Sequence, residues 1–240
     1  MTRLFLPLLA AFLAIQGVGT AQEEHTITGN VTLTLPVGTC TIPRLARRIA
    51  EDLKVPAGIE VLPGQCVGPR RVREAVMLTG MTLAEAMDRA ISEDPRYWWT
   101  LTDGVLVIRP LQAWGEREHF LHRTLTSFEI ENRNLDGITQ LVRQVLADRP
   151  VSDQPDRVIN TEEGDRRLSL ELSGTSIYDT LNAIVRAHGA LTWQLSYCRE
   201  PALQHLSMVV LRTFDGAGVS TAVNMEPYSP YCRQGPPVLL

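Results

Sequence analysis

Few side chains in this sequence have the types and spacing that catalysis or metal binding requires. His119 and His122 lie three residues apart and could share a helix face, but no carboxylate–histidine set lies near them to complete a zinc site. We therefore expect a solvated linker here and no bound metal. His188 precedes Gly189 at a predicted helix end, where a positive charge would offset the helix dipole. His205 is expected to be exposed.

The motifs of common enzyme classes are also missing from the sequence. It contains no G-x-S-x-G motif, no phosphate-binding Walker loop and no G-x-G-x-x-G motif. The run of residues 173–176 (SGTS) reads as a turn and helix cap, and Glu162 and Glu163 read as solvated charges. We expect a protein that is not an enzyme and that needs no cofactor.

The aromatic cluster of Tyr97, Trp98 and Trp99 is more informative. Successive side chains of a strand face opposite ways, so Trp98 should point outward if Trp99 packs on a helix. An exposed tryptophan can mark a contact surface, and we assign a protein-binding surface to Trp98, Thr100 and Tyr97. The alternative is that the linker or the other half of the chain covers Trp98.

These aromatic residues belong to a pattern that occurs twice. Residues 78–110 and 172–198 each read as a strand end, a glycine turn, an amphipathic helix and a strand. One constant offset pairs Gly80 with Gly174, Leu83 with Ile177, Glu85 with Asp179, Met87 with Leu181, Asp88 with Asn182, Ile91 with Val185, Trp99 with Trp193 and Leu101 with Leu195. Such a gapless match predicts two copies of one small module.

Hydrophobic periodicity and turn residues predict the order β-α-β-β-α-β-β for each copy, and hence an α+β fold with two helices against small sheets per copy. In the first copy we expect strands over 25–35, 59–62, 72–78, 97–101 and 105–109, and helices over 42–53 and after the N-cap Thr82. In the second copy we expect strands over 126–131, 168–172, 191–197 and 206–214, helices over 135–146 and after the N-cap Ser176, and a polar loop over 148–167.

The first residues are typical of a cleaved secretory signal peptide. Arg3 precedes an apolar run over 4–15, which is too short for a transmembrane helix of about 20 residues. Gly19 and Ala21 suit a cut before residue 22. We expect a protein exported to the periplasm, or alternatively beyond the cell, without a transmembrane segment after signal removal.

The predicted organisation is a signal peptide (1–21), module 1 (22–110), a linker (111–123), module 2 (124–214) and an irregular tail (215–240). The formal net charge of −4 and the lack of a basic stripe argue against nucleic acid as a partner.

The 4 cysteines are an even number in a chain that is predicted to be exported. The simplest of the possible pairings joins Cys40 to Cys66 and Cys198 to Cys232. Each bridge would stabilise the fold by roughly 3 to 4 kcal/mol in the chain-entropy model. A metal site is the alternative, but no pair has the C-x-x-C spacing.

The repeated pattern carries a resemblance to a known family. A strand ending in Leu-Thr/Ser-Gly, a helix beginning Thr/Ser-Leu/Ile-x-Glu/Asp and an aromatic strand followed by a hydrophobic hairpin resemble the secretin and TonB short N-terminal domain, and the related secretin N-domains. The likeness covers about 25–110 and 124–214, the second copy less closely because its last hairpin has an insertion over 199–205. It implies protein–protein contact in the periplasm and supplies no catalytic residues.

Domains of this family usually precede a barrel or a secretin ring, and no such segment follows here. We therefore expect a free-standing adaptor that serves an envelope assembly, either a secretin or a TonB-dependent receptor system. The alternative is a small-ligand or glycan binder that uses a cleft between the modules. A flat apolar face around Trp98 would favour the protein partner, and a concave pocket joining Trp98 to Arg and Asp side chains would favour the ligand.

Overall fold

The structure is a computed structural model of the 240-residue chain, and it describes residues 32–37, 41–62, 71–77, 80–92, 94–115, 119–146, 157–159, 162–197, 206–216 and 218–222. It is a mixed α+β fold, which confirms the class predicted from the sequence. The helices are α1 (Thr41–Leu53), α2 (Leu83–Ser92), α3 (Leu111–Gly115), α4 (Leu135–Leu146), α5 (Ile177–His188) and the 3-10 helix η1 (Phe120–His122).

The strands are β1 (Thr32–Val37), β2 (Ala57–Val61), β3 (Arg71–Met77), β4 (Tyr97–Thr102), β5 (Val105–Pro110), β6 (Thr124–Arg133), β7 (Arg157–Ile159), β8 (Leu168–Ser176), β9 (Leu191–Tyr197), β10 (Leu206–Thr213) and β11 (Gly218–Ala222). Seven of them form one sheet in the order β4-β5-β2-β9-β10-β11-β7, while β1 pairs with β3 and β6 pairs with β8.

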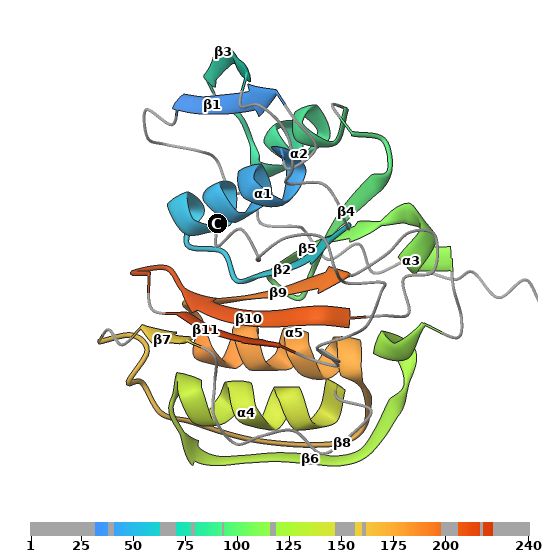
Figure 1. The fold of residues 1–240 in the computed structure, drawn as a ribbon, viewed down its shortest axis with the longest axis vertical. Coiled ribbons are helices and arrows are strands. Elements are labelled where there is room, and N and C mark those ends of the chain that lie inside the picture. The colour runs from blue at the N-terminus through green and yellow to red at the C-terminus, as the bar shows by residue number, and fades with distance from the viewer. Residues whose placement is uncertain are drawn as a thin grey trace, which may run out of the picture.

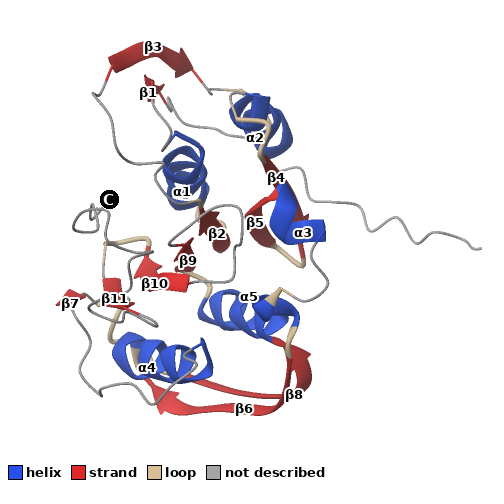
Figure 2. Cartoon of the chain, turned by 45° about the vertical axis from the view of Figure 1, so that its right-hand side comes forward, coloured by secondary structure: helices blue, strands red, loops and turns tan. Residues whose placement is uncertain are grey.

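The seven-stranded sheet is the middle layer of the molecule (Figure 1). Helices α1 and α2 lie on one side of it, and α4 and α5 lie on the other (Figure 2). The β1–β3 ribbon lies beyond the first helix pair, and the β6–β8 ribbon lies beyond the second. Among the described residues, no helix combines the length and the apolarity that crossing a membrane requires.

The two halves of the chain meet where β2 and β9 pair side by side. These strands run parallel, with Ala57 opposite Thr192 and Val61 opposite Ser196, and we call this pairing the seam. The other edge of β2 pairs with β5. Buried hydrophobic residues from both halves also form one cluster, which includes Ile42, Met87, Ile108, Ile184, Trp193 and Leu211. The halves therefore share a core.

The seam depends on a residue without a side chain. Gly58 lies opposite Trp193, and a Cβ atom at Gly58 would lie 2.1 Å from the Trp193 ring. The ring itself is held, because its Nε1 donates a hydrogen bond of 3.0 Å to Oδ1 of Asn182 on α5. Only glycine lets the fully buried indole lie flat across the neighbouring strand.

The helix ends follow from local sequence. Thr82 and Glu85 form the predicted capping box: Glu85 N donates to Thr82 Oγ1 over 3.2 Å, and Thr82 N donates to Glu85 Oε2 over 2.8 Å. Ser176 caps α5 by accepting from Asp179 N over 3.0 Å. Gly189 ends α5 with a φ of 78°, which confirms the expected C-cap.

The segment over 215–240, which we expected to be irregular, contains β11. This strand pairs antiparallel with β10 on one side and with β7 on the other. It satisfies backbone groups along β10 that would otherwise lack partners. Strand β7 in turn lies inside the loop that was predicted over 148–167. These pairings involve segments far apart in the chain, which explains why local patterns missed them.

We predict that Gly58→Ala destabilises the protein by about 2 kcal/mol or more, because the added methyl group overpacks against an indole that cannot move away. Urea unfolding followed by circular dichroism would measure the change. Gly115→Ala is the matched control, since a Cβ at Gly115 meets nothing within 4 Å, and it should change the unfolding free energy by less than about 0.5 kcal/mol. Equal stability of the two variants would contradict the packing described here.

Candidate functional site

Strand β4 is the first strand of the seven-stranded sheet and pairs only with β5 among the described residues. The two strands form a hairpin in which Thr102 lies opposite Val105. The turn residues Asp103 and Gly104 have φ values of 51° and 75°, as a two-residue type I′ turn requires. The predicted Asp-Gly turn is confirmed, and it sets the register of the edge strand.

The register decides which backbone groups of β4 face outward. In a two-residue hairpin the pair next to the turn exchanges hydrogen bonds, and bonded pairs then alternate along the strands. Residues 98, 100 and 102 therefore bond to β5, whereas residues 97, 99 and 101 do not. The N–H and C=O groups of Trp99 and Leu101 point to the open side.

Two large apolar side chains at or next to this edge are exposed. Trp98 is 55% exposed and Leu111 is 49% exposed, and they are the exposed large hydrophobic residues of the part that the structure describes. Trp98 lies opposite Arg109, so these two side chains share a face of the sheet. Leu111 is the first residue of α3, directly after β5. The outward orientation predicted for Trp98 is confirmed. Thr100, on that face too, is half-buried.

The opposite face of β4 packs on α2, and this overturns one predicted contact residue. Tyr97 is buried, and its hydroxyl accepts a 3.0 Å hydrogen bond from Leu62 N. Its side chain therefore cannot contact another protein. Tyr97 has the same orientation as Trp99, whose Nε1 donates to Asp88 Oδ1 over 2.8 Å. Burial raises the pKa of the Tyr97 hydroxyl, which remains protonated.

Behind Trp98 lies a buried polar cluster that bridges the two halves of the chain. We define it as Glu60 on β2, Arg109 on β5, Tyr197 on β9 and His119 from the linker, all buried. Arg109 Nε donates to Glu60 Oε1, and the Tyr197 hydroxyl donates to Glu60 Oε2. The Tyr178 ring of α5 lies 5.1 Å from the Arg109 guanidinium carbon, a distance typical of a cation–π contact.

The hydrogen bonds of the polar cluster fix the proton positions. His119 Nδ1 faces two donors, Leu121 N and Arg109 Nη2, each at 3.4 Å. This nitrogen must therefore accept, which leaves the proton on Nε2 to be donated to the Tyr197 oxygen 3.1 Å away. The Tyr197 hydroxyl in turn donates its hydrogen bond to the Glu60 carboxylate. This chain of hydrogen bonds from His119 through Tyr197 to Glu60 requires a neutral His119 and an ionised Glu60.

Burial shifts the pKa values of two groups in the polar cluster, Glu60 and His119. It raises the pKa of the Glu60 carboxyl, while the charge of Arg109 and the Tyr197 hydroxyl act against that rise. Burial, followed by the positive charge of Arg109, lowers the pKa of His119 to about 3. His119 is therefore neutral at any physiological pH, in agreement with its hydrogen bonds.

The expectation of a solvated linker is wrong for His119 and right for His122. His119 and Leu121 are buried in the segment over 111–123, while His122 is exposed. His119 points into the seam because Tyr197 offers it a polar partner there. In the part of the chain that the structure describes, no group of three His, Cys, Asp or Glu side chains could hold a metal ion.

His188 also differs from its predicted role. It is buried, and burial together with the charge of Arg166 lowers its pKa. A histidine that disfavours its charged form does not offset the helix dipole. The positive charge at this helix end comes from Arg166 instead, because its Nη1 donates to the His188 carbonyl oxygen over 2.9 Å.

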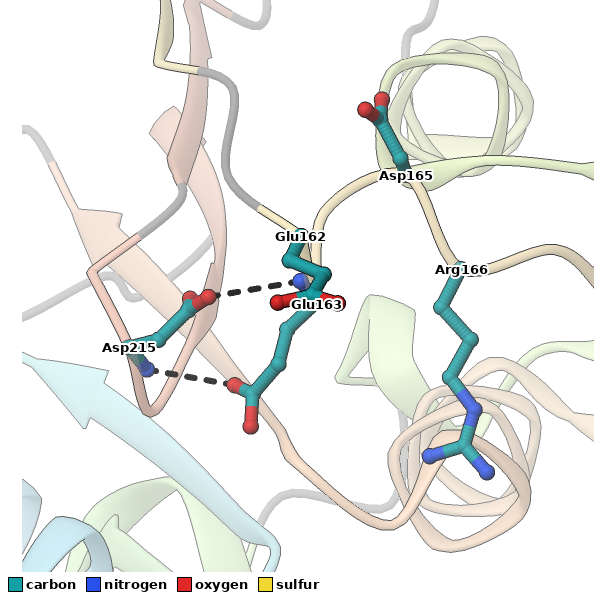
Figure 3. A pocket seen from close by; sticks show the side chains of 5 residues that line it. All are labelled: Glu162, Glu163, Asp165, Arg166 and Asp215. Atoms are coloured by element: carbon teal, nitrogen blue, oxygen red, sulfur yellow. Dashed lines mark hydrogen bonds between the residues drawn. The ribbon is translucent and has the colours of Figure 1, made fainter.

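A shallow pocket of about 590 Å³ lies near this helix end, lined by Glu162, Glu163, Asp165, Arg166 and Asp215 (Figure 3). Two of its carboxylates accept hydrogen bonds from backbone N–H groups. Glu163 Oε2 accepts from Asp215 N over 3.2 Å, and Asp215 Oδ2 accepts from Glu163 N over 3.3 Å. These bonds fasten the loop before β8 to the turn after β10. The pocket does not include Trp98.

Sequence reasoning missed Glu60, Arg109 and Tyr197. A signal existed, because Glu60 and Arg109 each interrupt a short apolar strand whose residues are otherwise hydrophobic. Two opposite charges in two buried strands predict an ion pair. The four predicted disulfide residues, Cys40, Cys66, Cys198 and Cys232, lie outside the described residues, as does the predicted signal peptide.

No family model matches this chain, and no match exists among the curated proteins or the solved structures compared with it. The likeness to the secretin and TonB short N-terminal domain therefore rests on the residue pattern alone.

We predict that Arg109→Met destabilises the protein by about 3 to 5 kcal/mol, because it leaves the Glu60 carboxylate buried without its main partner. Urea unfolding measures the loss. The double variant Arg109→Met with Glu60→Leu should recover part of it, since both charges are then gone. Strictly additive losses in the three variants would show that the two residues do not interact.

We predict that His119 makes the protein less stable in acid. Its pKa is about 3 in the folded chain and about 6.5 in an unfolded one, so its contribution is complete above about pH 6.5 and falls as the pH drops toward 3. His119→Asn keeps an acceptor near Leu121 N but cannot titrate, and it should flatten this slope between pH 4 and 6. The exposed control His122→Asn should leave the slope steep. A slope that His119→Asn does not change would refute the prediction.

Proposed function

We propose that this chain is an exported, non-catalytic protein-interaction protein of the cell envelope, and that it binds its partner at the open edge of β4. The observation that carries the proposal is the combination of outward backbone groups at Trp99 and Leu101, with which no described strand pairs, and the exposed side chains of Trp98 and Leu111. Such an edge can accept an extended segment as an additional strand.

We also propose that the fold arose from two copies of one module. Residues that match at a constant offset make the same contacts: the Trp99 indole bonds to Asp88 of the preceding helix, and the Trp193 indole bonds to Asn182. The helix caps match as well, with Thr82–Glu85 in one half and Ser176–Asp179 in the other. Gly80 and Gly174, which the offset also pairs, have φ values of 79° and 63°.

The proposed location is the periplasm, on the basis of the signal-peptide pattern over 1–21. The proposed partner is a component of a secretin or TonB-dependent receptor system, on the basis of the family resemblance. An open edge strand is otherwise a hazard for aggregation, which proteins usually reduce with charges, bulges or short strands. The six residues of β4 carry no charge, which supports a use for this edge.

The alternative of a ligand bound between the modules has less support. The two halves are joined by direct hydrogen bonding of β2 to β9, and the polar side chains at this seam are buried and bonded to one another. The pocket lined by Arg166 and its acidic neighbours does not include Trp98. A catalytic role for the polar cluster has little support too, because substrate could not reach Glu60 or His119.

The test is crosslinking of the mature protein in its native envelope, followed by pull-down and mass spectrometry. We expect wild type and the exposed-strand control Glu131→Ala to recover the same outer-membrane assembly protein. Trp98→Ala should reduce recovery about tenfold or more, because a buried interface tryptophan contributes about 2 kcal/mol. All three proteins must first show equal unfolding midpoints.

Equal recovery by wild type and Trp98→Ala would place the contact elsewhere and refute the β4 site. Recovery of no envelope protein by any of the three would refute the proposed function.

A further inference from the structure

The geometry of β4 points to the kind of segment that its edge accepts, and this inference rests on the proposed function. We propose that the edge binds an uncharged, extended segment of about five residues, antiparallel to β4, in which alternate side chains are aromatic or β-branched. These apolar side chains face Trp98, and the residues between them are small and polar.

The first step concerns the backbone. Trp99 and Leu101 direct their N–H and C=O groups outward, whereas the N–H of Tyr97 already donates to Asp94 O over 3.2 Å. Four backbone groups, two at each residue, therefore face outward with no described strand beside them. An antiparallel segment pairs with them through two of its own alternate residues, and antiparallel pairs are slightly more stable per residue than parallel ones.

The second step concerns the face with Trp98. Residues of the incoming segment that lie opposite Trp98 and Thr100 share their face of the sheet. Trp98 is 55% exposed, and Thr100, the next residue of β4 on its face, is half-buried. An aromatic or β-branched side chain beside Trp98 covers this exposed indole.

The third step concerns the other face. Trp99 is already half-buried against α2 and bonded to Asp88, and Leu101 packs against the core. Side chains opposite these two residues gain little apolar contact. Apolar side chains of the segment therefore gain contact only on the face of Trp98. Because successive side chains of a strand alternate between faces, the segment alternates apolar and polar residues.

The fourth step concerns charge. The six residues of β4 are neutral, and each charged residue next to the strand already has an opposite charge beside it. Arg96 lies 2.8 Å from Asp94 at one end, and Asp103 lies 3.0 Å from Arg186 at the other. A charged side chain in the middle of the segment would lose water without gaining a partner.

The test uses synthetic peptides with the core Thr-Val-Thr-Tyr-Thr and one lysine at each end for solubility. The first control has the same composition in the order Val-Tyr-Thr-Thr-Thr, which destroys the alternation. We expect the alternating peptide to bind at least about tenfold more tightly by isothermal titration calorimetry. Amide shifts in nuclear magnetic resonance should be largest at Trp99 and Leu101.

Backbone methylation distinguishes strand addition from simple hydrophobic contact. In the antiparallel arrangement the amides of the threonines face β4, and those of Val and Tyr face away. Methylating the central Thr amide should abolish binding, while methylating the Val amide should preserve it. The opposite result would place the segment parallel and overturn the proposed pairing.

Protein variants provide the second control. Trp98→Ala should weaken binding of the alternating peptide about tenfold, and Thr126→Ala on the exposed part of β6 should not change it. Equal affinity for the alternating and rearranged peptides would refute the proposed segment, even if the envelope pull-down depends on Trp98. The proposed function would then survive with a different contact mode.

Two measurements on the free protein identify other occupants of the edge. A dimer in sedimentation experiments that Trp98→Ala dissociates would make a second copy the occupant. Slow hydrogen exchange of the Trp99 and Leu101 amides in a monomer would mean that another segment of this chain covers them. Either result would overturn the inference.

Discussion

The parallel pairing of β2 with β9 is the constraint on which the rest of the structure depends. This pairing joins strands from the two halves of the chain into one sheet, and both helix pairs contribute to one hydrophobic core. Gly58 makes the pairing possible because the Trp193 ring occupies the space that its side chain would need. The Glu60–Arg109 ion pair forms within the first half, and Tyr197 of β9 adds a hydrogen bond to Glu60 where the halves are joined.

Joining the halves also decides which sheet edges remain. Strands that would be outer strands in separate modules become central, and β4 and β7 are left at the two ends of the sheet. The second half differs from the first because β11 lies between β10 and β7, whereas β5 pairs directly with β2. The hairpin that carries Trp98 is therefore the part of the repeat whose outer edge pairs with no other described strand.

The buried polar cluster connects this edge to the seam. Arg109 shares a face with Trp98 across the β4–β5 pair and bonds to Glu60 on the next strand. His119 reaches the same cluster from the linker, which explains why a segment that reads as polar and exposed packs inside the protein. A histidine can occupy such a site when it stays neutral and both ring nitrogens have partners.

The sequence alone determined what depends on neighbouring residues. The bounds of α4, the caps of α2 and α5, the Asp103–Gly104 turn and the outward direction of Trp98 all follow from periodicity and local hydrogen bonding. The tertiary structure decided the β2–β9 pairing, the addition of β11 and the burial of His119 and Tyr197. Pairing between distant strands and the solvation of one polar side chain depend on which surfaces meet, and no local pattern contains that information.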